Sequence, residues 1–114
     1  MADIIDRTVF EDLKATAGAD FVKDLVDTFI VEAPVMMEDL RSSLAANDAE
    51  RFRRTAHSLK SNSNTFGALT LAAMAKDLEL GGLGPVRAAS GASLDALEIE
   101  YTRVARALME LKRA

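Results

Sequence analysis

The single histidine of the chain, His57, and its neighbours are the residues whose types and spacing suit chemistry. An imidazole with an unperturbed pKa of about 6.5 is largely neutral at cellular pH, and its free ring nitrogen is nucleophilic. Lys60 follows about one helical turn later, where its ammonium can stabilise a transferring phosphoryl group. No second base and no glycine-rich phosphate loop accompany the pair in the sequence. The pattern therefore predicts acceptance of a phosphoryl group without hydrolysis, and the competing interpretation is an ordinary surface histidine.

The composition excludes several other kinds of site. The 114 residues include no cysteine, which rules out disulfide scaffolds, cysteine nucleophiles, iron–sulfur clusters and cysteine-based zinc sites. One histidine cannot form a polyhistidine metal centre within a single chain, so no metal site is expected. The net charge of −4 argues against a nucleic-acid-binding surface, which needs an excess of positive charge.

Two further patterns concern location. No apolar run approaches the roughly 18–20 residues that a membrane-spanning helix needs. The N-terminal stretch, MADIIDRTVFEDL, carries acidic residues where a signal peptide has a basic segment followed by an apolar one. We therefore expect a cytoplasmic protein without a membrane segment.

Apolar residues recur at helical spacing along the chain, and the alternation typical of strands is absent. We predict an all-α fold, an antiparallel up-down-up-down four-helix bundle at about residues 19–113. A short additional N-terminal helix at about residues 6–16 is expected to cap one end of this bundle. The whole chain, residues 1–114, is expected to form a single domain.

Turn and cap residues set the expected helix boundaries. Asp6 or Thr8 can cap the first helix, and Asp48 can cap the third. Pro85 suits the first turn of a fifth helix, which is expected to continue through Gly91 to the C-terminus.

Helical spacing also predicts which faces of the third and fourth helices point inward. At about 100° per residue, one inner face of the third helix is formed by Phe52, Ala56, Leu59, Ser63 and Phe66. His57 falls on the solvent side, together with Arg53, Lys60 and Asn64. The apolar stripe of the fourth helix is expected to comprise Leu69, Leu71, Met74, Leu78 and Leu80.

The run AHSLKSNSNTFGAL, residues 56–69, resembles the signature of histidine-containing phosphotransfer domains. That signature reads His-x-Leu-Lys-Gly, then small residues, then glycine about ten positions after the histidine. His57, Leu59, Lys60 and Gly67 fall in register with it. The resemblance covers about residues 20–112. The chain departs from the signature at Ser61, where the family usually has glycine. This difference is expected to affect the transfer rate and the choice of partner.

The resemblance implies a phosphorelay intermediate that shuttles a phosphoryl group through His57 between receiver-domain aspartates. It implies a carrier without kinase activity of its own, and no bound cofactor, because the Mg²⁺ used in transfer belongs to the receiver. Lys60 would position the phosphoryl group. Glu79 matches a family position whose side chain can orient the imidazole, and a plain surface carboxylate is the alternative. The implied partners are receiver domains of a hybrid histidine kinase or of response regulators. The chain itself is expected to be a monomer.

A docking surface for such a partner is expected beside His57. The candidate docking residues are Arg53, Arg54, Ser61, Asn64, Gly67, Ile4 and Ile5. The arginines are equally consistent with an ordinary solvated helix face. The N-terminal isoleucines qualify only if the first helix packs near the histidine.

Two alternative functions remain open at this stage. One alternative is a helical adaptor that binds receivers without phosphoryl chemistry, although both His57 and Lys60 are retained. The other alternative is the dimerisation and phosphoacceptor segment of a sensor kinase. That segment usually has an acidic residue directly after its histidine, whereas this chain has Ser58.

Overall fold

The structure, a computed structural model, describes residues 4–113. Six helices follow one another along the chain, and no strand occurs within these residues. Their bounds are α1 Arg7–Ala17, α2 Ala19–Ala45, α3 Ala49–Phe66, α4 Leu69–Gly81, α5 Leu83–Ala88 and α6 Ala92–Arg113. The all-α prediction is therefore confirmed.

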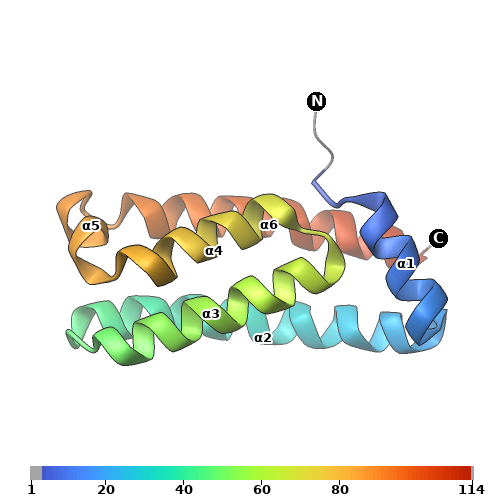
Figure 1. The fold of residues 1–114 in the computed structure, drawn as a ribbon, viewed down its shortest axis with the longest axis horizontal. Helices are drawn as coiled ribbons and strands as arrows, with labels where there is room; N and C mark the ends of the chain where they lie inside the picture. The colour runs from blue at the N-terminus through green and yellow to red at the C-terminus, as the bar shows by residue number, and fades with distance from the viewer. Residues whose placement is uncertain (1–3, 114) are drawn as a thin grey trace.

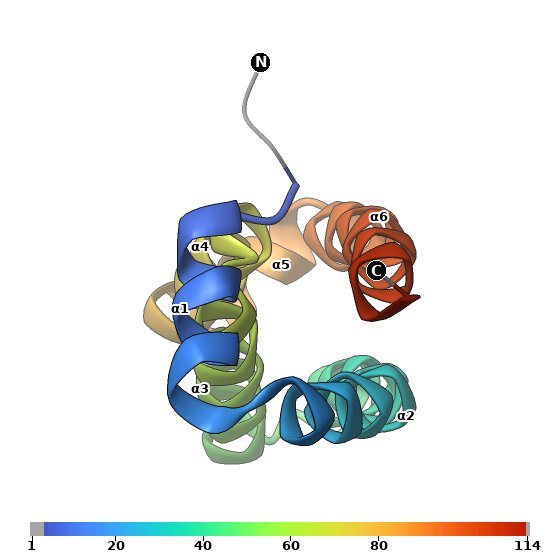
Figure 2. The same ribbon diagram turned by 90° about the vertical axis from the view of Figure 1, so that its right-hand side faces the viewer.

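The four long helices α2, α3, α4 and α6 run antiparallel in chain order and form the bundle (Figure 1). The short helix α1 lies across one end of the bundle, where it contacts α2 and α3 (Figure 2). The start of α2 and the end of α6 lie near this same end, whereas α5 lies at the opposite end (Figure 1). The predicted capping helix and bundle are thus both present.

Helices α2, α3 and α5 end in the same hydrogen-bonded motif, which allows a short connection to the following helix. At the end of α3, the amide of Gly67 donates to Asn64 O at 3.0 Å and that of Ala68 donates to Ser63 O at 2.9 Å. Gly67 adopts a left-handed backbone with φ of 81°. This pair of bonds is the Schellman motif. Only Gly67 and Ala68 separate the end of α3 from the start of α4.

The expected fifth helix is instead two helices, which corrects the sequence-based boundary. Ser90 has φ of 54° and Gly91 has φ of 80°, so the chain turns between α5 and α6. The amide of Gly91 donates to Val86 O at 2.9 Å, as a Schellman motif requires. Ser90 and Gly91 together therefore end α5 and allow α6 to start in a new direction.

The N-terminal caps follow the sequence more closely. The Asp6 side chain accepts a hydrogen bond from Val9 N, and that of Asp48 accepts one from Arg51 N at 3.1 Å. Each carboxylate satisfies a backbone donor that the first turn of a helix leaves without a partner. Asp6, rather than Thr8, is therefore the cap of α1.

The long helix α2 continues across Pro34 without ending there. Proline has no amide hydrogen, so the carbonyl of Ile30, four residues earlier, lacks its usual intrahelical donor. The hydroxyl of Tyr101 on α6 donates to Ile30 O at 3.2 Å. Tyr101 also stacks edge-on against Phe29 at 5.9 Å between ring centroids. One side chain of α6 thus compensates for the proline and ties α6 to α2.

The predicted inner face of α3 is confirmed, since all five residues proposed for it are buried. Phe52, Ala56 and Leu59 have no solvent exposure. On α4 the predicted apolar stripe is only partly correct. Leu71 and Leu78 are buried, as predicted. Leu80 is 74% exposed and Leu69 is 47% exposed, so both point outward.

Candidate functional site

His57 lies on the outer face of α3, two residues before the buried Leu59. Its side chain is 55% exposed, whereas Leu59 has no exposure. Two residues so close in sequence point in nearly opposite directions because a change of two positions along a helix rotates a side chain by about 200°. The predicted placement of His57 on the solvent side is confirmed.

Glu79 of α4 contacts both His57 and Lys60 of α3. Its Oε2 atom lies 2.8 Å from His57 Nδ1, and its Oε1 atom lies 2.8 Å from Lys60 Nζ. The short connection after α3 folds α4 back along it, which brings together residues 22 and 19 positions apart in sequence. The Glu79 side chain is 13% exposed and that of Lys60 is 24% exposed, so the histidine is the outermost member.

Glu79 is held in its ionised form. The hydrogen bond from Lys60, and then that from His57, lowers the pKa of Glu79 below its ordinary value of 4.5, although partial burial acts in the opposite direction. An ionised carboxylate can only accept hydrogen bonds, so His57 Nδ1 must donate. The lone pair of the neutral ring is then on Nε2. Within residues 4–113, no hydrogen bond occupies that nitrogen.

The cationic and polar residues expected around the histidine are largely accessible. Ser61 and Asn64 are exposed on α3, as are Arg53 and Arg54. Glu50 lies 2.8 Å from Arg53 and 3.9 Å from Arg54, so it partly offsets their charge. Exposed pairs of this kind contribute little to stability and leave the side chains free to exchange partners.

Two of the expected docking residues are instead structural. Ile5 is 3% exposed and belongs to the core, which corrects the expectation of an accessible side chain, while Ile4 is 37% exposed. Gly67 is buried, and a Cβ atom there would lie 2.8 Å from the carbonyl oxygen of Asp6. The amide of Asp6 donates to Gly67 O at 2.8 Å, so this glycine seats the start of α1.

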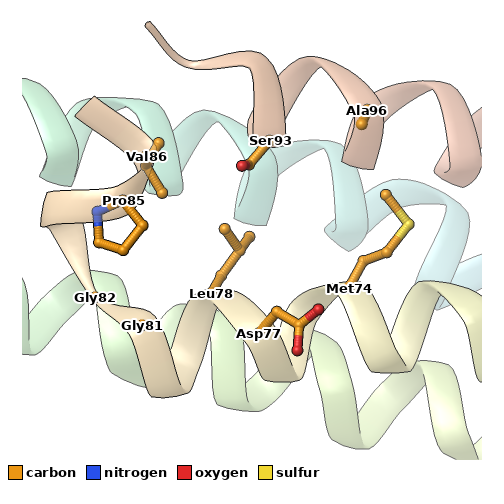
Figure 3. A pocket seen from close by; sticks show the side chains of 9 residues that line it. All are labelled: Met74, Asp77, Leu78, Gly81, Gly82, Pro85, Val86, Ser93 and Ala96. Carbon is orange, nitrogen blue, oxygen red and sulfur yellow. The ribbon is translucent and has the colours of Figure 1, made fainter. Parts of the chain in front are cut away.

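A groove of about 280 Å³ lies between α4, α5 and α6, away from the histidine (Figure 3). Met74, Asp77 and Gly81 line it from α4, and Ser93 and Ala96 line it from α6. Figure 3 shows Met74 and Leu78 of α4 pointing toward the part of α6 that carries Ser93 and Ala96. Glu79 is not among its lining residues. The groove is therefore separate from the His57 site.

Neither a metal site nor a membrane segment is found in the described part of the chain. No group of three or more histidine, cysteine or carboxylate side chains is placed to hold a metal ion within residues 4–113. Of the helices described, none combines the length and apolar character needed to cross a membrane.

Comparison with known proteins shows the family of the chain. The sequence model of the family described as Hpt domain matches residues 24–107, and the chain belongs to this family. The structure is similar to the crystal structure of histidine-containing phosphotransfer protein B (HptB) from Pseudomonas aeruginosa PAO1, with a TM-score of 0.87 and 29% identity. The match covers 99% of this chain and 97% of that chain. No curated protein matches the sequence.

Membership of this family defines the class of protein. The chain is a histidine phosphotransfer protein of the kind that serves in multistep phosphorelays. Members of the family carry phosphoryl groups and interact with the receiver domains or kinases of two-component systems.

Proposed function

We propose that His57 is the phosphoacceptor and carries a phosphoryl group between the aspartates of receiver domains. The observation that supports this most directly is the contact of 2.8 Å between His57 Nδ1 and Glu79, on a side chain that is 55% exposed. It leaves Nε2 available to a donor arriving from solvent. No other histidine occurs among the 114 residues, so a histidine-dependent carrier has one candidate.

The transfer needs only groups already placed at this site and the incoming donor. The Nε2 lone pair forms a bond to the phosphorus of an aspartyl phosphate, while the P–O bond to the aspartate breaks and its carboxylate leaves. The proton on Nδ1 stays in place, so the ring gains positive charge as the N–P bond forms. The Glu79 carboxylate stabilises that charge at hydrogen-bond distance. The reverse step passes the phosphoryl group to another receiver.

Lys60 acts on the charge of the phosphoryl group. Its ammonium lies 2.8 Å from Glu79 Oε1 before transfer. Phosphorylation adds negative charge beside a carboxylate, and a cation between the two reduces their repulsion. We therefore assign Lys60 a role both before and after phosphorylation. It keeps Glu79 ionised before transfer and turns toward the phosphoryl oxygens afterwards.

The remaining properties follow from this role. The partners are receiver domains of a hybrid histidine kinase or of response regulators, and the protein acts as a cytoplasmic monomer over residues 1–114. It has no kinase activity of its own, and the chain carries no resident cofactor or metal. The Mg²⁺ required for transfer is supplied by the receiver.

Phosphoramidate tests the proposal because this small donor phosphorylates accessible histidines without a partner. We expect intact mass spectrometry to report one added phosphoryl group that is lost in acid. The matched control is His57→Gln, which should show no uptake, while its circular dichroism spectrum shows that it is folded.

Two results would overturn the assignment. Uptake that persists in His57→Gln would place the phosphoryl group on another residue. A folded wild-type protein that takes up none would favour the adaptor function. Size measurement separates the sensor-kinase segment, which is an obligate dimer, from the monomer proposed here.

A further inference from the structure

Ser61 lies on the same outer face of α3 as His57, four residues later in the sequence. Its side chain is exposed, at the position where the chain departs from the signature that it resembles. Residues four apart on a helix lie one above the other, with Cβ atoms about 5–6 Å apart. Because side chains on a helix tilt toward its N-terminus, that of Ser61 leans toward His57. The Ser61 hydroxyl is therefore a neighbour of the imidazole.

The hydroxyl groups on α3 differ in what they bind. Ser63 Oγ donates to Leu59 O at 2.7 Å, and Thr65 Oγ1 donates to Ser61 O at 3.0 Å. Each of these two hydroxyls is satisfied within the helix, by the carbonyl four residues earlier. Among the described residues, the Ser61 hydroxyl has no hydrogen-bond partner. Its proton is available to a group that arrives from solvent.

The cations one turn from His57 are, in contrast, already paired. The ammonium of Lys60 lies 2.8 Å from Glu79 Oε1. On the preceding turn, the guanidinium of Arg53 lies 2.8 Å from Glu50 Oε1. Each cation must move away from a carboxylate before it contacts a phosphoryl group on the histidine. A hydroxyl without a partner can donate to that group without breaking an existing contact.

Ser61 and Lys60 flank His57 on opposite sides. At about 100° per residue, Lys60 is rotated about 60° from His57 in one direction and Ser61 about 40° in the other. Glu79 approaches Nδ1 from the side of Lys60, since it contacts both residues. A phosphoryl group on Nε2 thus stands between an ammonium and a hydroxyl, with three oxygens that accept hydrogen bonds. Asn64 is more distant, since it lies seven residues after His57, about 10 Å along the axis.

We propose that Ser61 binds the phosphoryl group, because its hydroxyl donates a hydrogen bond to a phosphoryl oxygen as the group joins His57. This inference rests on the proposed function, since it concerns the same acceptor. In this step Nε2 forms a bond to phosphorus, the bond from phosphorus to the leaving group breaks, and Ser61 keeps its own proton. Negative charge on the phosphoryl oxygens strengthens the hydrogen bond. The bond exists in the transition state but not in the free protein, so it accelerates phosphorylation.

A serine at this position could instead act only by its size. A side chain larger than glycine narrows the approach to His57, and removal of the hydroxyl would then speed phosphorylation. A hydrogen bond predicts the opposite sign, because removal of the hydroxyl takes away a donor and slows phosphorylation. The direction of the change therefore distinguishes the two effects.

The test compares Ser61→Ala with Ser58→Ala, two truncations of exposed serines on α3. Ser58 is the matched control, because it is rotated by about 100° from His57 and adjacent residues on a helix do not face each other. Each protein is incubated with phosphoramidate, and intact mass spectrometry measures the rate of uptake. Alanine favours a helix more than serine does, so a slower rate cannot result from loss of the helix. We expect uptake to slow at least about threefold in Ser61→Ala and less than about 1.5-fold in Ser58→Ala.

Phosphorus NMR of the phosphorylated proteins adds a readout that a purely structural role would not change. A hydrogen bond to a phosphoryl oxygen alters the electron density at phosphorus. We therefore expect the phosphohistidine resonance to shift in Ser61→Ala and to keep its wild-type position in Ser58→Ala.

The outcomes separate the two proposals. Uptake by Ser61→Ala that is unchanged or faster, or equal losses in both variants, would overturn the role of Ser61 and leave that of His57 intact. An unshifted phosphorus resonance in Ser61→Ala would overturn the role of Ser61 as well. Failure of the folded wild type to take up a phosphoryl group would instead contradict the proposed function.

Discussion

The inner and outer faces of α3 use neighbouring residues for opposite purposes. Leu59 has no solvent exposure and packs in the core, whereas His57, two positions earlier, is 55% exposed. The inner face contributes to the free energy of folding, since buried apolar area stabilises the bundle. The outer face contributes little to it, yet it holds His57, the proposed nucleophile. One helix thus separates stability from chemistry by the rotation between adjacent side chains.

The strongest test of this separation is a pair of substitutions. Leu59→Ala should lower the free energy of unfolding by about 2–5 kcal/mol, because it leaves a cavity in the core. His57→Gln should change it by less than about 0.5 kcal/mol, because its side chain is exposed. Urea unfolding of both variants measures the difference. A larger loss in His57→Gln than in Leu59→Ala would contradict the assignment of the two faces.

Gly67 tests whether a signature residue near His57 belongs to the chemistry or to the fold. We expect Gly67→Ala to cost about 2–4 kcal/mol, because left-handed backbone disfavours a Cβ atom and the start of α1 must move. The new Cβ would lie 2.8 Å from Asp6 O and 3.0 Å from Val9 Cβ.

The control for that substitution is Gly91→Ala. Gly91 has a similar φ of 80°, but nothing lies within 4 Å of a Cβ placed there. Its cost should be about 1–2 kcal/mol, from the backbone alone. Thermal unfolding compares the two, and equal losses would show that the contact with α1 is unimportant.

Glu79 tests the polar cluster of the outer face. Glu79→Gln should slow phosphoramidate uptake by about tenfold, because the carboxylate stabilises the positive charge that the ring gains as the N–P bond forms. Glu98→Gln is a matched control, since Glu98 is hydrogen-bonded to Arg41 at 2.8 Å in a separate cluster. Uptake rates that fall equally in both variants would indicate a general charge effect.

The smallest expected effect is a pH dependence of stability from Glu79. Its pKa in the folded protein is lowered, mainly by the hydrogen bond from Lys60, so the ionised form is favoured by folding. The resulting stabilisation is fully present above the ordinary value of 4.5 and is lost as the pH falls through the lowered pKa. Urea unfolding of the wild type and Glu79→Gln between pH 6 and about pH 3 should therefore converge on acidification. A difference that stays constant across this range would contradict the pairing with Lys60.

Helical periodicity was sufficient where a helix has one clearly apolar side. On α3, charged and polar residues fill the outer face, so the spacing of Phe52, Ala56 and Leu59 identifies the core and places His57 outside it. On α4, leucine, alanine and methionine occur almost all round the helix. Periodicity therefore could not distinguish the exposed Leu80 from the buried Leu78, and it wrongly placed Leu80 on the inner face.

The sequence by itself determined the helical class, the position of the histidine on α3 and the cap Asp48, because these depend on residues within a few turns of one another. Only the tertiary structure decided what meets His57. Glu79 lies 22 positions away, and its contact depends on how α4 folds back after Gly67. Local spacing fixes the direction of a side chain within its helix, whereas the register between two helices is set by packing along their whole length.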